Sequence, residues 1–270
     1  MTKGGTTTPI SLADLQAMKP RGEKIVCLTV YDACFTQLLE AAGVDMFIVG
    51  DSLGMVLLGH ESTQPVTMED MIYHAANVAR TGRRAVRVVD LPYRSYTTAE
   101  QALANARRLV AEGGAHMVKL EGGTAQARIV AHLVEQGMPV CGHVGLLPQS
   151  VTAPDGYRVQ GRAAEAAQAI MEDALALQAA GAGLLVIECV PAELAARITA
   201  ALTIPTTGIG AGAGCDGQVL VLHDMLGISP GPHPKFVQDF LAGSGSIRAA
   251  IESYVRAVRD GTYPDARHSY

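Results

Sequence analysis

Four short apolar segments in this chain each end in a single carboxylate that is followed at once by loop residues. These segments are residues 46–50 before Asp51, 85–89 before Asp90, 116–120 before Glu121 and 183–187 before Glu188. Short segments rich in Val, Ile, Leu and Met are typical of parallel strands buried on both faces. Open α/β sheets and α/β barrels build their sites at the carboxyl ends of such strands. We therefore expect the four acids to converge, and a cluster of acids favours a metal ion.

Four more apolar segments bring the number to eight, and a helix is expected after each of them except the seventh. The remaining strands are expected at residues 25–31, 139–143, 204–209 and 218–222. Helices are expected at residues 33–42, 67–80, 98–112, 125–136, 163–180, 192–201 and 234–259, after a short leading helix at 11–18. Long loops are expected at residues 52–67 and 145–162.

This alternation predicts one α/β domain over residues 1–270, a (β/α)8 TIM barrel with a short N-terminal helix. No shift in composition marks a linker, and a chain of 270 residues has the length of one such barrel. Residues 1–10 are expected to form a flexible tail. A doubly wound open sheet is the competing fold, because it is built from the same alternation.

Charge and composition narrow the class of partner. The net charge is −5, and no basic run or basic patch interleaved with aromatic residues is present, which argues against nucleic acid. The five cysteines show no CxxC spacing, which indicates buried free thiols in a reducing compartment. The N-terminus lacks the apolar core of a signal peptide, and no apolar run is long enough to cross a membrane. We expect a soluble, cytoplasmic protein.

Asp51 and Asp90 follow neighbouring strands, so their carboxylates are expected to meet above the barrel. Two hard oxygen ligands, completed by substrate oxygens and water, describe a Mg²⁺ site. Zinc is less favoured, because no His or Cys lies near either acid in the sequence. The alternative is that each acid only caps the loop after its strand.

Lys119 and Glu121 stand two residues apart on one predicted strand, so their side chains face the same way. A buried lysine needs a partner, and nearby acids or a substrate carboxylate would serve. Three interpretations stay open at this point. Lys119 forms a structural ion pair with Glu121 or Asp90, anchors a substrate carboxylate, or forms a Schiff base with a carbonyl substrate.

Glu188 and His143 each end a predicted strand. The apolar neighbours on both sides of Glu188 are expected to raise its pKa toward the range of a useful general base. A carboxylate that only caps the following loop is equally compatible with the sequence. His143 is a candidate for binding substrate or orienting another group, and a purely structural histidine is the alternative. The glycine-rich stretch 208–212 follows a strand where barrels often hold phosphate, and a tight turn explains it equally well.

Several motifs together resemble one known family, the ketopantoate hydroxymethyltransferases, from about residue 11 onward. They occur in this order: TVYD (29–32), VGDSLGM (49–55), HESTQPVT (60–67), DLPY (90–93), MVKLEGG (117–123), PVCGHVGL (139–146), PQS (148–150), GYRVQG (156–161), LVIECVP (185–191), GIGAG (208–212) and the pair His223–Asp224. So many motifs in one order make the resemblance highly specific. The departures, Arg94 and residues 153–155, lie in expected loops and would affect folate contacts rather than the reaction.

The resemblance implies transfer of a hydroxymethyl group from 5,10-methylenetetrahydrofolate to 3-methyl-2-oxobutanoate, giving 2-dehydropantoate in pantothenate and coenzyme A biosynthesis. It further implies a homodecamer built from rings of five. Carried over by motif, Asp51 and Asp90 bind Mg²⁺ and contact substrate, while Glu121 completes the metal site. Ser52 and Lys119 contact the substrate carboxylate, and Glu188 is the proton acceptor.

The chemistry that the resemblance implies agrees with these residue types. A 2-oxo acid chelates Mg²⁺ through its keto and carboxylate oxygens, which acidifies its C3 proton for removal by Glu188. The anchoring role of Lys119 is then favoured over a Schiff base, because the metal already stabilises the enolate charge. A magnesium-dependent C–C lyase or mutase is the alternative enzyme. A metabolite-binding scaffold without catalysis is the non-enzymatic alternative.

Overall fold

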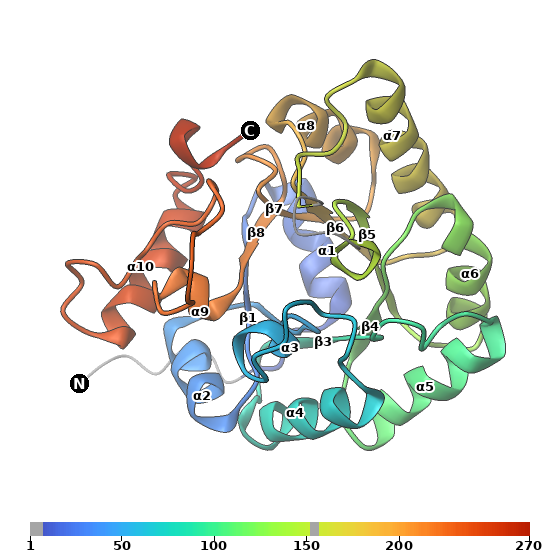
Figure 1. The fold of residues 1–270 in the computed structure, drawn as a ribbon, viewed down its shortest axis with the longest axis horizontal. Coiled ribbons are helices and arrows are strands. Elements are labelled where there is room, and N and C mark those ends of the chain that lie inside the picture. Colours follow the sequence, from blue (N-terminus) through green and yellow to red (C-terminus); the bar gives the residue numbers. More distant parts are fainter. Residues whose placement is uncertain (1–7, 152–156) are drawn as a thin grey trace.

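The computed structural model describes residues 8–151 and 157–270, and it is a closed barrel of eight parallel strands in sequential order, β1 to β8 (Figure 1). Pairing between β1 and β8 closes the barrel, which confirms the predicted TIM barrel and excludes the open sheet. The strands are β1 (Ile25–Thr29), β2 (Met46–Val49), β3 (Val86–Asp90), β4 (Met117–Lys119), β5 (Val140–Gly145), β6 (Leu184–Glu188), β7 (Thr206–Ile209) and β8 (Gly217–Leu220).

The helices form an outer ring around the strands (Figure 1). The ring consists of α2 (Ala33–Ala42), α4 (Met68–Thr81), α5 (Ala99–Ala111), α6 (Ala127–Glu135), α7 (Ala164–Ala179), α8 (Ala192–Ala201) and α10 (Ile247–Arg259). Three further helices are α1 (Leu12–Arg21) and the short α3 (Leu53–Val56) and α9 (Leu222–Met225). Side-chain caps fix several starts. Thr67 and Asp70 form the predicted capping box at α4, and Ser11 and Asp14 form another at α1.

Helix α1 lies behind the strands in Figure 1, at the amino-terminal end of the barrel. Its Lys19 Nζ bonds Asp216 Oδ2 at 2.8 Å and the Thr199 carbonyl at 2.7 Å. At the same end, the buried Asp45 bonds Arg84 and Arg259, which precede β3 and end α10. These contacts connect helices and loops at the amino-terminal end of the barrel, which is the end away from the four acids.

The C-terminal region differs from the prediction. Residues 234–246 are not helical, and α10 begins only at Ile247. Gly243 and Gly245 adopt φ of 75° and 79°, which interrupts a helix, and Ser246 then caps α10. Phe240 is buried edge-on against Tyr254 and Tyr263, so this segment packs as an irregular chain over α10.

Smaller differences lie at loops and ends. The predicted strand 218–222 ends at Leu220, where α9 begins two residues later, and the predicted loop 52–67 contains α3. Residues 1–7 of the expected tail lie outside the described residues, whereas the Ile10 N–H donates to the Arg84 carbonyl. Four cysteines are buried free thiols as predicted, but Cys34 is exposed. Within the described ranges, no helix has the length and apolar character needed to span a membrane.

Candidate active site

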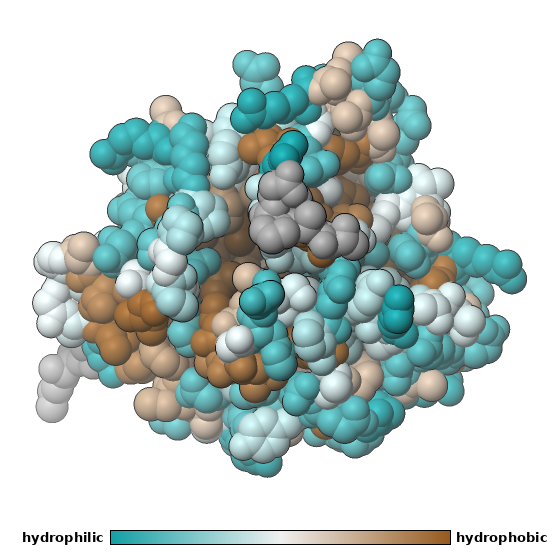
Figure 2. Space-filling view, viewed as in Figure 1, coloured by the Kyte–Doolittle hydropathy of each residue, from teal (hydrophilic) through white to brown (hydrophobic). Residues whose placement is uncertain are grey.

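The four strand-end acids line one cavity at the carboxyl ends of the strands, with a volume of about 640 Å³. Asp51, Asp90 and Glu121 are each less than 5% exposed, and Glu188 opens further toward the cavity, with 16% of its side chain exposed. Figure 2 looks at this end of the barrel and shows apolar residues around a hollow near the centre of the view. The predicted convergence of the acids is therefore present in the fold.

Asp51 and Asp90 meet directly above β2 and β3. The Asp51 N–H donates to Asp90 Oδ2 at 3.2 Å, while Asp90 Oδ1 is buried and has no hydrogen-bond partner among the described residues. Burial, and then the charge of Asp90, raise the pKa of Asp51 to about 7. The pair thus holds two carboxylates close together with one oxygen of Asp90 unsatisfied.

Lys119 supplies positive charge to this cluster. Its Nζ lies 3.0 Å from Asp90 Oδ2 and 3.4 Å from His143 Nδ1. Burial by itself would lower the pKa of Lys119, but Asp90, Glu121 and Asp51 outweigh burial and hold that pKa above its ordinary value. Lys119 is therefore a protonated ammonium ion, and the ion pair with Asp90 that the sequence left as one alternative is present.

Glu121 and His143 extend the cluster toward β5 and β6. Glu121 Oε1 lies 3.7 Å from His143 Nδ1, and burial raises the pKa of Glu121 well above its ordinary value. His143 Nε2 lies 3.2 Å from Glu188 Oε2, but the alignment falls outside hydrogen-bond geometry, so this is a close polar contact. Burial and the nearby Lys119 lower the pKa of His143, which favours the neutral ring.

The chain turns sharply directly after Glu188. Cys189 has a φ of 47°, unusual for a residue with a side chain, and its N–H donates to the Ile209 carbonyl at 2.8 Å. Gly145 on β5 has a φ of 94°, and a Cβ there would lie 2.2 Å from the Glu188 carbonyl oxygen. Glu188 is thus held between a residue in the left-handed region and a close approach of β5, and its carboxylate lies beside His143 at the cavity.

Ser52 also lines the cavity, at the start of α3. Its Oγ lies 2.9 Å from the Tyr31 hydroxyl. A Cβ on Gly50 would lie 3.0 Å from Ser52 Oγ and 3.4 Å from Asp90 Oδ2, so this glycine allows the close approach of the two side chains. Every predicted site residue therefore contributes to the lining of one cavity.

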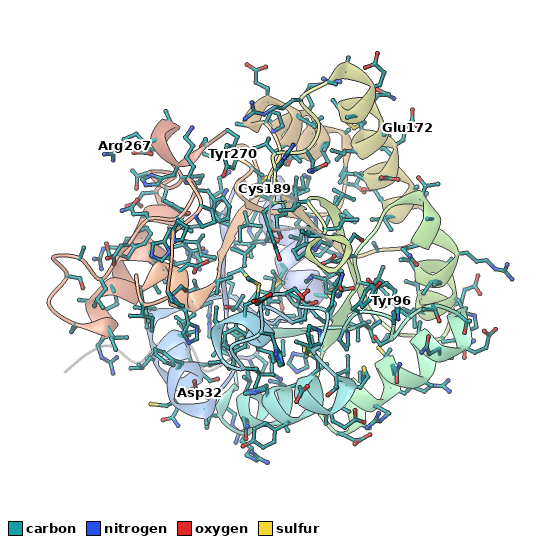
Figure 3. The ribbon with its side chains drawn as sticks, viewed as in Figure 1. Asp32, Tyr96, Glu172, Cys189, Arg267 and Tyr270 are labelled. Atoms are coloured by element: carbon teal, nitrogen blue, oxygen red, sulfur yellow. The ribbon has the colours of Figure 1, made fainter. Side chains whose placement is uncertain are left out.

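Two residues that sequence reasoning did not single out are central to the cluster. The Gln149 side chain donates to Asp51 Oδ2, its backbone N–H donates to Glu121 Oε2, and Tyr96 donates to its amide oxygen. Gln149 lies in the PQS motif, in the short 3₁₀ helix Pro148–Ser150 within the predicted loop. In Figure 3, Tyr96 lies on the side of the barrel that carries α5 and α6, whereas Cys189 lies beside β6 and β7. Only the motif itself signalled Gln149.

The glycine-rich stretch 208–212 is explained by close packing. A Cβ on Gly208 would lie 2.8 Å from Cys215 Sγ, and one on Gly210 would lie 2.6 Å from Phe236. A Cβ on Gly212 would lie 2.4 Å from the Ala192 side chain. These contacts favour the tight-turn interpretation over a phosphate site.

The cavity has the composition of a cation site. Among the residues that the structure describes, its lining carries the four strand-end carboxylates and Asp224 but one ammonium group, that of Lys119. Across residues 8–151 and 157–270, no three His, Cys, Asp or Glu side chains are grouped as a complete metal site. A hard divalent ion that keeps water and substrate oxygens as further ligands fits this arrangement, because it needs few protein ligands. The unsatisfied Asp90 Oδ1 is an available ligand.

Comparison with known proteins adds independent findings. The family model described as ketopantoate hydroxymethyltransferase matches residues 9–266. A 3-methyl-2-oxobutanoate hydroxymethyltransferase of Nitrosococcus oceani is 56% identical over 261 residues, which cover 97% of this chain and 99% of that protein. The protein of the same name from Halorhodospira halophila is 54% identical, over 97% of this chain and 94% of that protein.

Solved structures with low sequence identity share the fold. A phosphonopyruvate hydrolase in complex with oxalate and Mg²⁺ has a TM-score of 0.61 at 12% identity, and the match covers 96% of this chain and 93% of that one. A 2,3-dimethylmalate lyase of the PEP mutase/isocitrate lyase superfamily has a TM-score of 0.55 at 13% identity, over 77% of this chain and 80% of that one. At these identities the similarity shows the barrel alone.

Proposed function

Because the chain belongs to the ketopantoate hydroxymethyltransferase family and is a transferase, we propose that it transfers a hydroxymethyl group from 5,10-methylenetetrahydrofolate to 3-methyl-2-oxobutanoate. The product would be 2-dehydropantoate, for pantothenate biosynthesis. The observation that supports this most is the set of four strand-end acids around Lys119 in one cavity of about 640 Å³. That cavity has room for a small 2-oxo acid and part of a larger co-substrate.

Mg²⁺ is the proposed metal. Asp51 and Asp90 would hold it, and Glu121 would support it from the next strand. When bound, the ion would act as a Lewis acid that makes the C3 proton of the 2-oxo acid easier to remove. The support for this assignment is the excess of buried carboxylates over ammonium groups and the unsatisfied Asp90 Oδ1.

Lys119 and Ser52 would bind the substrate carboxylate. Both side chains line the same cavity, and Lys119 is held protonated by its acidic neighbours. A protonated amine is not a nucleophile, so a Schiff-base role is disfavoured. Lys119 would instead balance the negative charge of the substrate in a water-poor site, where an ion pair is stronger than in water.

Glu188 would be the general base, because it is the most exposed of the four acids and faces the cavity. Its carboxylate would take the C3 proton, and the released electron pair would form the new bond to the one-carbon unit. Water would supply the hydroxyl oxygen while both C–N bonds of the methylene bridge break. The two folate nitrogens would take up protons, so that the carrier leaves as tetrahydrofolate. His143, whose Nε2 lies 3.2 Å from Glu188 Oε2, would orient that carboxylate.

The proposed function is tested by turnover with purified protein, Mg²⁺, 3-methyl-2-oxobutanoate and 5,10-methylenetetrahydrofolate. We expect 2-dehydropantoate to form only when all four are present. A magnesium-dependent lyase or mutase of the same fold would consume a 2-oxo acid without folate. A non-catalytic scaffold would consume neither the oxo acid nor the folate. Absence of folate-dependent product would therefore reject the transfer reaction.

We also propose that the protein works in the cytoplasm as a homodecamer. Several large apolar side chains are exposed on the described surface, which supports contact with further copies: Met55, Leu57, Leu58, Ile228 and Ile247. Sedimentation equilibrium would show ten copies of the 28.2 kDa chain. A monomer or dimer at micromolar concentration would contradict the decamer and leave the reaction unaffected.

A further inference from the structure

Gln149 bonds two of the acids at once, from two different atoms. Its side-chain Nε2 donates to Asp51 Oδ2 at 2.8 Å, and its backbone N–H donates to Glu121 Oε2 at 3.0 Å. Gln149 follows β5 and is only 2% exposed, whereas Asp51 follows β2 almost a hundred residues earlier. One buried residue therefore connects two carboxylates that follow different strands, β2 and β4.

The amide of Gln149 is held in one orientation. Its Nε2 also donates to the Leu91 carbonyl at 3.0 Å, while its Oε1 accepts from the Tyr96 hydroxyl. Asp51 and Leu91 offer only acceptor oxygens when Asp51 is ionised, so a flipped amide would place Oε1 against two acceptors. Tyr96 would then have to accept from the NH₂ group, and its own proton would be left with the more distant Glu121 carbonyl at 3.5 Å. The contacts thus define which end of the amide faces Asp51.

These bonds leave one oxygen of each acid for another ligand. Gln149 occupies Oδ2 of Asp51 and Oε2 of Glu121. Lys119 and the Asp51 N–H occupy Oδ2 of Asp90, and its Oδ1 has no partner within the described residues. Gln149 is neutral, so it orients the acids without cancelling the negative charge that would attract a cation. Lys119 cannot do this, because it neutralises the acid that it contacts.

We propose that Gln149 is a positioning residue that sets the orientation of Asp51 and Glu121 for a divalent cation, and that Tyr96 fixes the Gln149 amide. This inference rests on the magnesium site of the proposed function. Gln149 would act through the two carboxylates, without contact to substrate. Residues that orient metal ligands in this way affect metal affinity by roughly 10- to 100-fold when they are replaced.

Calorimetric titration of Mg²⁺ alone into metal-free protein tests the inference without substrate or turnover. Gln149→Met keeps the length of the side chain and the backbone N–H, but removes the donor to Asp51 and the acceptor for Tyr96. We expect its Mg²⁺ dissociation constant to rise at least tenfold. Tyr96→Phe frees the amide to flip, so a smaller rise of several-fold is expected. Excess Mg²⁺ should restore the kcat of Gln149→Met.

Gln64→Met is the matched control. Gln64 Nε2 donates to the Gln149 carbonyl at 3.0 Å, so it supports the same segment without contacting either acid. The same substitution there should lower thermal stability and leave Mg²⁺ affinity unchanged. Tyr254→Phe, which loses bonds from a buried hydroxyl to the Cys27 and Gln218 carbonyls, is the control for Tyr96→Phe.

The outcomes separate the inference from the function on which it rests. Wild-type affinity for Mg²⁺ in both Gln149→Met and Tyr96→Phe would overturn the positioning role while leaving the metal site intact. An equal loss in Gln64→Met would also overturn it, since support of the loop would then explain the effect. No Mg²⁺ binding by the wild-type protein would reject the metal site and the inference with it. If Gln149→Met does not fold, Tyr96→Phe decides.

Discussion

The cavity contains several buried carboxylates and few groups that compensate their negative charge. Asp51, Asp90 and Glu121 are buried together, and Lys119 is the one ammonium group that the described part of the chain contributes to the lining. Buried carboxylates repel each other and favour the protonated form, unless a cation or a donor stabilises the charge. The site therefore carries an electrostatic cost in the absence of metal, and that cost is measurable.

The stability of the metal-free protein should depend on the ionisation of Asp51. Because its pKa is raised to about 7 in the folded state, the folded state binds this proton more tightly than the unfolded chain does. The contribution of Asp51 is thus fully present below about pH 4 and is lost as the pH rises to about 7. Relative to Asp51→Asn, wild type should lose stability over this range, in urea unfolding with a chelator present.

This dependence should be absent above about pH 8, where Asp51 is ionised in both states. Added Mg²⁺ should stabilise wild type more at pH 8 than at pH 6, because the metal competes with the proton. A constant difference between wild type and Asp51→Asn from pH 4 to pH 8 would contradict the raised pKa.

The role proposed for Glu188 predicts a separation between binding and proton removal. Glu188→Gln keeps the shape of the side chain and removes the base, so the oxo acid should still bind. Exchange of its C3 proton into deuterated water should fall by at least about 100-fold, the lower end of the usual effect of general-base catalysis. Proton exchange is followed by NMR without folate. Exchange at the wild-type rate would exclude Glu188 as the base.

At the scale of elements, glycines set how closely neighbouring strands and loops approach. Gly217 on β8 pairs with Ile25 on β1, where the barrel closes. A Cβ on Gly217 would lie 2.4 Å from the Ile25 carbonyl oxygen, which is backbone and cannot move aside cheaply. The last strand pairing of the barrel therefore depends on a residue without a side chain.

Gly217→Ala should destabilise the fold by about 3 kcal/mol, the upper range for overpacking a core. Urea unfolding measures this difference. Gly59→Ala is the control, because Gly59 has a φ of 74° but a Cβ there meets no atom within 4 Å. It should cost only about 1 kcal/mol, the strain of a left-handed backbone. Equal stability of Gly217→Ala and wild type would show that β1 and β8 adjust without penalty.

At the scale of the whole molecule, the two ends of the barrel have separate tasks. The carboxyl ends of the strands carry the acidic cavity, and the amino ends carry ion pairs that join distant parts of the chain away from that cavity. Asp45, only 2% exposed, receives bonds from Arg84 at 3.1 Å and from Arg259 at 2.7 Å. It thereby connects the start of β2 to the end of the last long helix.

Asp45→Ala should lower stability and leave the chemistry intact. The change leaves the Val26 N–H without its acceptor and removes the carboxylate from two guanidinium groups, which keep the Val44 and Lys24 carbonyls as acceptors. Because Arg259 is 35% exposed and partly screened by solvent, we expect a cost of about 2 kcal/mol. We expect a lower midpoint of thermal unfolding and an unchanged kcat at 25 °C for the folded fraction. A reduced kcat in fully folded protein would show that the two ends are coupled.

The sequence was informative wherever structure follows a local pattern. Eight apolar segments predicted eight strands, and the acid after four of them predicted the composition of the cavity, because parallel strands end on one side of a barrel. The capping box at Thr67 predicted the start of α4. Where Phe236, Phe240 and two glycines interrupt residues 234–246, the prediction of a helix was wrong, since long-range packing overrides local propensity there.

The order of strands and the position of the acids are thus determined by the sequence itself, through hydrophobic periodicity and strand ends. Only the tertiary structure decided how the acids are held. Gln149 donates to Asp51, which lies 98 residues away in the sequence. Glu121 and Glu188 both lie close to ring nitrogens of His143. Such contacts depend on how loops from different strands meet above the barrel. The hydrophobic periodicity of the sequence does not predict these loop contacts, because they are fixed by packing between residues far apart in the chain.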